Sequence, residues 1–428
     1  MLVINVGWEI PESSRYSGRS APLQSSTLEN ALNYLRGPVN QWFKNIAPEN
    51  PRQWSVQNGS SYMISPPSVL LNELGCNNIL GSGEDTLLNQ VITSGSAAAK
   101  AAGYDVSRYD VVIYVWSRSV CHFDGRTTEI GGKAIGLPVL SAARHELGHR
   151  LGLYHVEGSA CTDGDGQPVT LSENCHVLPA GDPYDMMGVT TEGIFGAMSQ
   201  TFLGWMPNQV VNLNGGDFTG TWTIRPLSEI GQSPRAIRLV DGPTTLWLEY
   251  RQPTGLEAPN LTGADEWETN GSPITYGLVI HREEAHLLGA PTSYLLDMTP
   301  GSDRNPFTNA AGDYGDFRDA PLAVGRTWAN PLGEMKITLN SAAATGATVT
   351  ISTRRLTVPD VRGHSLEQAE AILAAAGLRS AGFESAIDPT CAYLGVVAAE
   401  SPGPGSRILP ETPVHIPIGE KDLTRECL

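Results

Sequence analysis

The sequence has little charge and an excess of acidic over basic residues. Charged residues make up 17% of the 428 residues, against about a quarter in ordinary globular proteins. The 45 acidic and 28 basic residues give a formal net charge of −17, which repels nucleic acids and anionic lipid surfaces, so we expect no nucleic-acid partner. Hydrophobic residues reach 40%, which is enough for buried cores and excludes bulk disorder.

Long apolar segments are also missing. The longest strongly apolar run spans residues 111–116, far short of the roughly 20 residues that cross a bilayer, so we expect no membrane span. Residues 1–8 lack the basic start and the apolar length of a secretion signal, and they are predicted to form a first buried strand. Any export signal would therefore have been removed or would lie outside this chain.

No two of the six cysteines form a CxxC pair. This spacing favours disulfides, and hence an oxidising compartment outside the cell, over zinc-ribbon or thioredoxin chemistry. Six cysteines allow 15 pairings. Proximity along the chain predicts Cys161–Cys175, Cys391–Cys427 and Cys76–Cys121.

The order of strand and helix signals predicts a multidomain α+β protein. The first expected domain, residues 1–215, is a mixed twisted sheet with helices. Residues 161–187 are predicted to be irregular and 196–205 a short helix. The other elements predicted for this domain are strands at 2–6, 111–116 and 133–137, a helix at 85–102, and a helix at 28–46 that is broken at Gly37-Pro38.

Two further domains are expected. Residues 217–354 consist of short alternating runs separated by Gly, Pro and Asn turns, which predicts an all-β sandwich over 216–355. Residues 356–428 are predicted to be a small α/β module. Its helix at 366–376 begins with a capping box of Ser365 and Gln368 and ends at Gly377.

The segment 140–151 is predicted to be a helix that packs on the sheet. An apolar stripe at three- and four-residue spacing is formed by Leu140, Ala143, Leu147 and Leu151. His145 and His149, at positions i and i+4, lie about 40° apart around such a helix and face away from the stripe. Both imidazoles can therefore reach one metal ion from the same side.

Three histidines are expected to hold one catalytic zinc ion. Gly152 can adopt the left-handed conformation that ends a helix, which lets His155 approach the ion already held by His145 and His149. Three neutral imidazoles leave the fourth tetrahedral position for water, as in catalytic zinc sites. Glu146 would take a proton from this water as it attacks a carbonyl and would later pass the proton to the departing amine.

The segment from His145 to His155 (HELGHRLGLYH) resembles the zinc-binding motif of the metzincin clan of endopeptidases at every fixed position. The segment 182–188 (DPYDMMG) resembles the Met-turn of that clan, with Met187 as the methionine under the zinc. Together with LGW at 203–205 and the later LEYRQP and DAPL segments, it is most similar to gametolysin-type peptidases. The resemblance implies a metzincin catalytic domain over residues 1–215 that cleaves protein or peptide substrates.

The resemblance also implies where substrate binds. Metzincins bind substrate as an extended strand against the edge of their upper sheet. The candidate edge strand here contains Lys133, Ala134, Ile135 and Gly136, and a plain strand before the helix is the alternative. Val189 stands where some metzincins have a tyrosine that contacts the metal or the transition state, so no such contact is expected.

Residues 356–419 resemble a PASTA module. The resemblance rests on Val358-Pro359-Asp360-Val361, the helix at 366–376, SPGPG at 401–405 and a final strand that ends at Gly419. PASTA modules of bacterial penicillin-binding proteins and kinases are associated with peptidoglycan. The resemblance thus implies a bacterial, secreted protein at the cell wall with peptidoglycan as a partner, and a spacer role is the alternative.

Two acidic groups are candidates for binding calcium, which braces loops in many secreted proteases. One group contains Asp163 and Asp165 in a DGDG turn, and the other contains Asp313 and Asp316. Solvated acidic turns are the alternative, because neither group has the spacing of an EF-hand loop.

The sequence as a whole predicts a secreted zinc-dependent endopeptidase in which Glu146 activates zinc-bound water. Two alternatives remain open. One is a zinc hydrolase that cuts cell-wall peptides or amides. The other is a wall-binding protein whose catalytic site has decayed.

Overall fold

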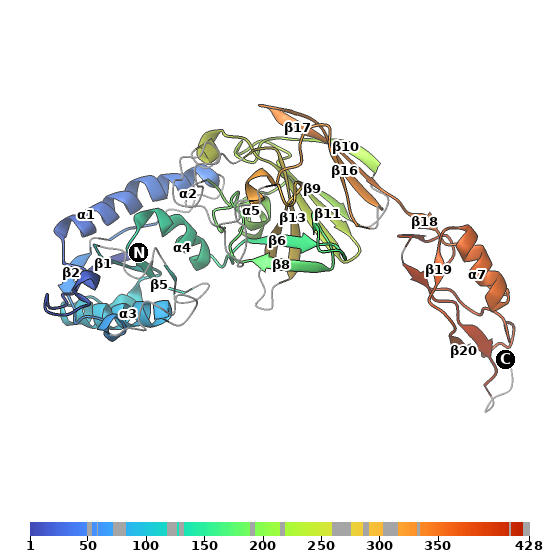
Figure 1. Cartoon of the computed structure of the whole chain (residues 1–428), viewed down its shortest axis with the longest axis horizontal. Coiled ribbons are helices and arrows are strands. Elements are labelled where there is room, and N and C mark those ends of the chain that lie inside the picture. Colours follow the sequence, from blue (N-terminus) through green and yellow to red (C-terminus); the bar gives the residue numbers. More distant parts are fainter. Residues whose placement is uncertain are drawn as a thin grey trace. The chain divides into compact units, whose positions relative to one another are not determined.

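A computed structural model of the chain, shown in Figure 1, is rich in strands and has few helices. This content agrees with the predicted α+β class. The structure describes residues 1–48, 54–57, 59–71, 83–117, 126–127, 132–188, 193–214, 219–258, 275–285, 291–302, 316–331, 334–410 and 412–422. Short 3-10 helices lie at Ser17–Arg19, Ser68–Leu71, Val106–Arg108, Leu140–Ala142, Gly255–Glu257 and Asp316–Asp319.

The chain divides into two compact units. The first comprises Met1–Val211, Arg225–Arg238 and Thr245–Pro321, and the second comprises Asn212–Ile224, Leu239–Thr244 and Leu322–Leu428. These units differ from the predicted boundaries at 215 and 355. The reason lies in β14 (Pro291–Leu296), which pairs in parallel with β6 (Glu157–Thr162) and so joins the segments on either side of residue 215 in one sheet.

The first unit begins with a five-stranded sheet. Its order is β2-β1-β3-β5-β4, with β4 antiparallel and the other strands parallel. The predicted strands at 2–6 and 111–116 are confirmed. The five strands are β1 (Leu2–Gly7), β2 (Ser60–Met63), β3 (Val112–Val115), β4 (Arg126–Thr127) and β5 (Ala134–Leu137).

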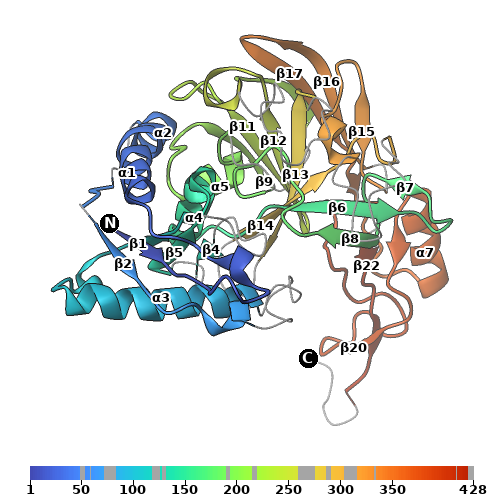
Figure 2. The same ribbon diagram turned by 60° about the vertical axis from the view of Figure 1, so that its left-hand side comes forward.

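Helices cover both faces of this sheet. Figures 1 and 2 show α3 (Gly83–Ala101) on one face, and α1 (Ser25–Tyr34) and α2 (Asn40–Ile46) on the other. Alternate strand residues serve the two faces, because Ile4 and Val112 pack with α3 whereas Val3 and Ile113 pack with α1 and α2.

The predicted break at Gly37-Pro38 is not a break. A π-helical segment, Leu35–Val39, links α1 to α2 and contains Pro38. Pro38 has no N–H to donate, and the wider π-type turn lets the helix continue past it.

A second sheet, most of whose residues lie in the first unit, corrects the prediction that residues 161–187 are irregular. It has the order β7-β6-β14-β13-β12-β11-β9, and β8 also pairs with β6. The disulfide Cys161–Cys175 joins β6 to β8, as predicted. The further elements are β7 (Pro168–Val169), β8 (Asn174–Leu178), β9 (Val210–Asn214), β11 (Ala236–Asp241), β12 (Thr244–Tyr250) and β13 (Leu278–Ala285), with the helices α4 (Ala143–Arg150) and α5 (Ala197–Phe202).

The second unit contains a four-stranded antiparallel sheet of order β10-β17-β16-β15. Side chains of β17 alternate between buried and half-buried, as the alternating sequence runs predict. The strands are β10 (Thr219–Ile224), β15 (Thr327–Ala329), β16 (Met335–Ala343) and β17 (Gly346–Thr353).

The chain ends in a small module with its own core. Its helix α7 (Leu366–Ala375) has the predicted capping box of Ser365 and Gln368, and Gly377 follows with φ +76°. Nine buried apolar side chains, among them Val361 and Leu373, form the core cluster. Short strands pair in twos: β18 (Leu356–Thr357) with β21 (Arg407–Ile408), β19 (Arg379–Ser380) with β22 (Pro413–Val414), and β20 (Ser385–Ile387) with β23 (Ile418–Glu420).

Among the described residues, no helix is both long and apolar enough to span a membrane. Cys391 is disulfide-bonded, whereas Cys76, Cys121 and Cys427 lie outside the described residues. Their predicted pairings therefore remain predictions.

Candidate metal centre

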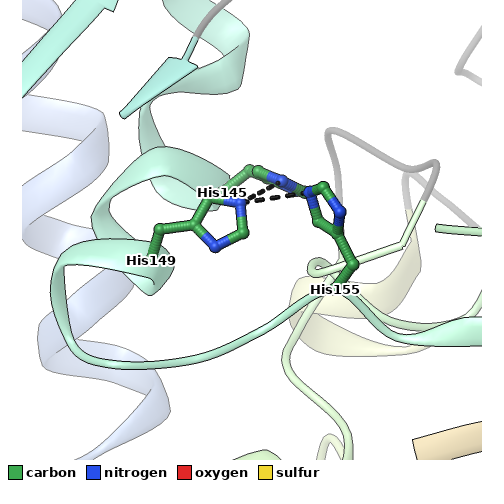
Figure 3. A group of neighbouring side chains, drawn as sticks. All are labelled: His145, His149 and His155. Carbon is green, nitrogen blue, oxygen red and sulfur yellow. Dashed lines mark hydrogen bonds between the residues drawn. The ribbon is translucent and has the colours of Figure 1, made fainter. Parts of the chain in front are cut away.

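Three histidine rings converge near the end of α4. The Nε2 atoms of His145 and His149 lie 3.1 Å apart, and those of His149 and His155 also lie 3.1 Å apart. Figure 3 shows the three rings turned toward one another, two of them on the helix and the third on the segment that follows it. Within the described part of the chain, no other three His, Cys, Asp or Glu side chains bring ligand atoms within 4.8 Å of one another.

The local fold explains why the rings meet. His145 and His149 lie one turn apart on α4, so they share a face of the helix. Gly152 follows the helix with φ +94°, a conformation that favours glycine and reverses the chain. This reversal brings His155 back to the two helical histidines. On the opposite face, the predicted apolar stripe packs against the core as expected, with Leu147 fully buried.

Two main-chain carbonyls orient the helical histidines. The Nδ1 of His145 lies 2.8 Å from the carbonyl oxygen of Met186, and the Nδ1 of His149 lies 2.9 Å from that of Leu153. A carbonyl can only accept, so each Nδ1 must donate its proton. Burial and the nearby His155 ring lower the pKa of His145 to about 4, which keeps this ring neutral. The neutral ring of His145 then presents an unprotonated Nε2 toward the point where the rings meet.

This arrangement fits a divalent metal. The Nε2 atoms of His145 and His149 lie 3.1 Å apart, so a single cation could accept the lone pairs of both rings. Nitrogen ligands at the usual zinc distance of about 2.0–2.1 Å lie about 3.3 Å apart in a tetrahedron. Neutral imidazoles held by second hydrogen bonds are also the ligand state that zinc requires. The donor set, its protonation and its spacing therefore suit zinc.

Glu146 follows the first of these histidines on α4. Its side chain is only 4% exposed, although a carboxylate is rarely buried without a specific role or partner. A buried carboxylate next to a candidate metal ligand can exchange protons with a small molecule bound there.

Met187 packs directly beneath the helix. A Cβ atom added at Gly148 would overlap the Sδ of Met187 and would lie 3.1 Å from the ring of Phe195. Only glycine therefore allows this close approach between α4 and the methionine. The sequence motif predicts Met187 under the site, and the structure places it in the same core cluster as Leu147.

The main chain around Met187 contacts both parts of the site, which are helix α4 and the segment that contains His155. The carbonyl of Met186 accepts from His145, and the carbonyl of Met187 accepts from the backbone N–H of Val156 at 3.0 Å, next to His155. Sequence reasoning could not identify these contacts, because every residue carries a carbonyl group.

A buried ionic network lies next to the segment 182–188, and the sequence analysis does not predict it. The Oδ1 and Oδ2 atoms of Asp185 accept from the backbone N–H groups of Met187 at 2.8 Å and Gly196 at 2.7 Å. Arg251 donates to Glu249 through Nε at 3.0 Å and Nη2 at 2.6 Å. Nearby, His281 and Asp182 form a buried pair with Nε2 and Oδ2 2.7 Å apart.

The candidate substrate strand is not at the edge of its sheet. β5 lies between β3 and β4, so Ile135 and Gly136 pair with Ile113 and Tyr114 on one side and with β4 on the other. Ile135 and Gly136 are therefore not at the edge of the sheet, whereas substrate binding along the strand that Lys133 and Ala134 begin stays a prediction. Among the described residues, β4 is the outer strand on this side of the sheet.

Two of the predicted calcium ligands, Asp163 and Asp316, accept hydrogen bonds from the main chain. The Oδ1 of Asp163 accepts from the backbone N–H groups of Asp165 at 3.0 Å and Gln167 at 2.8 Å. Asp316 accepts from the backbone N–H of Gly301 at 2.7 Å. Asp313 lies outside the described residues.

Comparison with known proteins supports one part of the chain. Residues 356–420 match the PASTA domain family, in agreement with the independent core and capped helix of the C-terminal module. The chain therefore carries a C-terminal PASTA domain. No curated protein matches the chain, so an assignment for the residues before 356 depends on the geometry of the site.

Proposed function

We propose that this protein is a zinc-dependent endopeptidase with a gametolysin-like metzincin catalytic domain. The observation that carries the proposal is the convergence of three Nε2 atoms, two of them 3.1 Å apart on α4, with both Nδ1 protons directed at main-chain carbonyls. The metzincin-type motif from His145 to His155 and the position of Met187 under α4 support the same assignment.

The residues of the site divide the reaction between them. A zinc ion held by His145, His149 and His155 would polarise a substrate carbonyl and acidify a water molecule. Glu146 accepts the proton of the attacking water and passes it to the amine that leaves. The carbonyls of Met186 and Leu153 keep the two helical rings in the tautomer that presents Nε2.

The substitution Glu146→Gln tests the proposal. It retains the shape of the side chain but removes its ability to take up a proton, so casein hydrolysis should fall by about 10²–10⁴-fold. The zinc content, measured by elemental analysis, should stay at the wild-type level because the three histidines remain. Glu173→Gln, at an exposed position between β7 and β8, is the matched control and should keep full activity. An active Glu146→Gln protein would refute this mechanism.

The PASTA domain favours a second candidate within the same chemistry. It supports a secreted, wall-associated protein of bacteria, in which the zinc centre cuts wall peptides or amides. Digestion of casein and of purified peptidoglycan in parallel, each with and without chelator, separates the two substrates. Binding to wall sacculi by the full chain, compared with the chain ended before residue 356, tests peptidoglycan as a partner. A protein that binds sacculi but neither zinc nor substrate would instead be a wall-binding protein with a decayed site.

A further inference from the structure

A cluster of charged side chains is fully buried behind the Met-turn. We call Asp185, Glu249, Arg251 and Glu257 the Arg251 network. Arg251 has no exposed surface, and none of the three carboxylates is more than 2% exposed. Arg251 forms ion pairs with Glu249 and Glu257. Buried charges of this kind are costly, so they are retained where they serve a specific arrangement.

The network is connected to the metal centre through backbone N–H groups. Asp185 accepts from Met187 with one oxygen and from Gly196 with the other. Glu249 accepts from Ala197, the first residue of α5, at 2.6 Å while its other oxygen binds Arg251. The two carboxylates thus hold two consecutive residues, Gly196 and Ala197, on one side and the Met-turn on the other.

The carboxylate of Asp185 and the guanidinium of Arg251 both lie close to Gly196. A Cβ at Gly196 would lie 2.6 Å from Oδ2 of Asp185 and 3.5 Å from Nη2 of Arg251. Burial and the nearby Asp182 raise the pKa of Asp185 to about 7, and Arg251 opposes this rise. Arg251 therefore favours the charged form of Asp185, which accepts both hydrogen bonds.

We propose that Asp185 is a positioning residue for the metal centre. Asp185 fixes the peptide around Met186 and Met187, whose carbonyls hold the ring of His145 and the segment after His155. The proposal rests on the proposed zinc function, because it concerns how firmly that site holds its metal. It also requires β12 and the residue that follows it, since Glu249 and Arg251 lie there, outside the predicted catalytic domain of residues 1–215.

The test uses the full chain carrying Asp185→Asn. An asparagine retains one oxygen for Met187, but its amide group would face the N–H of Gly196. We expect the dissociation constant for Zn²⁺, measured by competition with a chelator, to rise about 10–100-fold, as when other partners of metal ligands are lost. The absorption spectrum of the Co²⁺-substituted protein should change, and kcat should fall more than KM rises. Near-ultraviolet circular dichroism should stay that of the folded protein.

Asp182→Asn is the matched control. Asp182 is also buried, and its Oδ1 likewise accepts from the backbone N–H two residues ahead, that of Tyr184. It contacts neither Met187 nor Gly196 in any hydrogen bond among the described residues, and loss of its charge would favour the charged form of Asp185 that accepts both bonds. This variant should lower thermal stability while its Zn²⁺ affinity stays within about twofold of wild type, because a purely structural effect acts on the unfolding equilibrium.

Gly196→Ala serves if Asp185→Asn fails to fold. It displaces the Asp185 carboxylate without removing a charge, and it should also weaken Zn²⁺ binding and change the Co²⁺ spectrum. The positioning role is overturned if the folded variant binds Zn²⁺ as tightly as wild type, or if Asp182→Asn weakens binding equally. A wild-type protein that binds no zinc would contradict the proposed function itself, which the same titration shows before any variant is compared.

Discussion

Main-chain carbonyls, and not an acidic side chain, set the tautomer of the helical histidines in which Nε2 would be available to a metal. Met186 and Leu153 each provide the oxygen that accepts from Nδ1. Substitution of either residue's side chain leaves this oxygen in place. At Met186 and Leu153 the site therefore depends on the conformation of the main chain. Gly148, the left-handed Gly152 and the buried Asp185 fix that conformation.

Asp297, which follows β14, is a second buried acid with a shifted pKa. It is 3% exposed, and its Oδ1 accepts from the N–H of Thr299 at 2.8 Å. Its Oδ2 has no hydrogen-bond partner among the described residues. Burial, together with the nearby Asp316 and Asp319, raises the pKa of Asp297 to about 7.

This shift predicts a pH dependence of stability. Because the folded-state pKa lies above the unfolded value, the native protein binds more protons between about pH 4 and pH 7, and its stability falls as the pH rises through this window. Asp297→Asn resembles the protonated acid, so it should be more stable than wild type at pH 8 by up to about 4 kcal/mol. Near pH 4 the two proteins should unfold at similar temperatures. Thermal unfolding across this pH range provides the measurement.

Asp165→Asn, at an exposed position, is the control and should keep the wild-type dependence. If Asp297→Asn is instead the less stable protein at pH 8, the charged form of Asp297 has a favourable partner, such as a calcium ion.

At the scale of elements, the contact between α4 and Met187 depends on Gly148. We expect Gly148→Ala to push Met187 and Phe195 away from the helix and to destabilise the fold by about 1–3 kcal/mol through overpacking. Zinc affinity should fall as well, because the carbonyl groups of Met186 and Met187 move with the methionine. Thermal unfolding and a zinc titration measure the two effects.

Gly164 provides the comparison for this substitution. It lies in the turn after β6, with open space where a Cβ would be added. Gly164→Ala should leave stability within about 0.5 kcal/mol of wild type, with zinc binding unchanged. Equal effects of the two substitutions would show that the close contact under α4 does not hold the site.

Elements with a local signal could be predicted, whereas those that depend on distant partners could not. The spacing of His145, His149 and Gly152 determines the helix and its reversal within one short segment. Strand β6 consists largely of small residues (EGSACT), and its pairing with β14, more than 130 residues later, is invisible in a sequence window. The two-residue strand β4 could not be predicted either, because its only signal is its pairing with β5. Without β4, β5 is expected at the edge of the sheet.

The Arg251 network was missed because single charged residues in a sequence indicate an exposed surface. Asp185 and Arg251 are 66 positions apart, and only the pairing of β12 within the second sheet of the first unit brings Arg251 near the Met-turn. The three histidines of the candidate site could thus be identified from the motif, but the groups that support them could not.

At the scale of the whole molecule, the candidate metal centre and the PASTA domain lie in separate cores. Met187, Leu147, Trp42 and Trp205 share one buried cluster in the first unit, whereas the PASTA domain has its own cluster. None of the nine tryptophans occurs after Trp328. Tryptophan fluorescence therefore reports the unfolding of the chain before residue 356 and does not report the unfolding of the PASTA domain.

Removal of zinc should consequently destabilise one part of the molecule and spare the other. A metal that binds only the native state, at 100 times its dissociation constant, contributes about 2.7 kcal/mol. With chelator, the unfolding temperature followed by tryptophan fluorescence should fall by several degrees and should recover when Zn²⁺ is restored. Calorimetry should show the transition of the PASTA domain at an unchanged temperature, because no histidine of the metal centre lies in its core. If chelator leaves the fluorescence transition in place, the three histidines hold no zinc in the native protein, and the proposed function is contradicted.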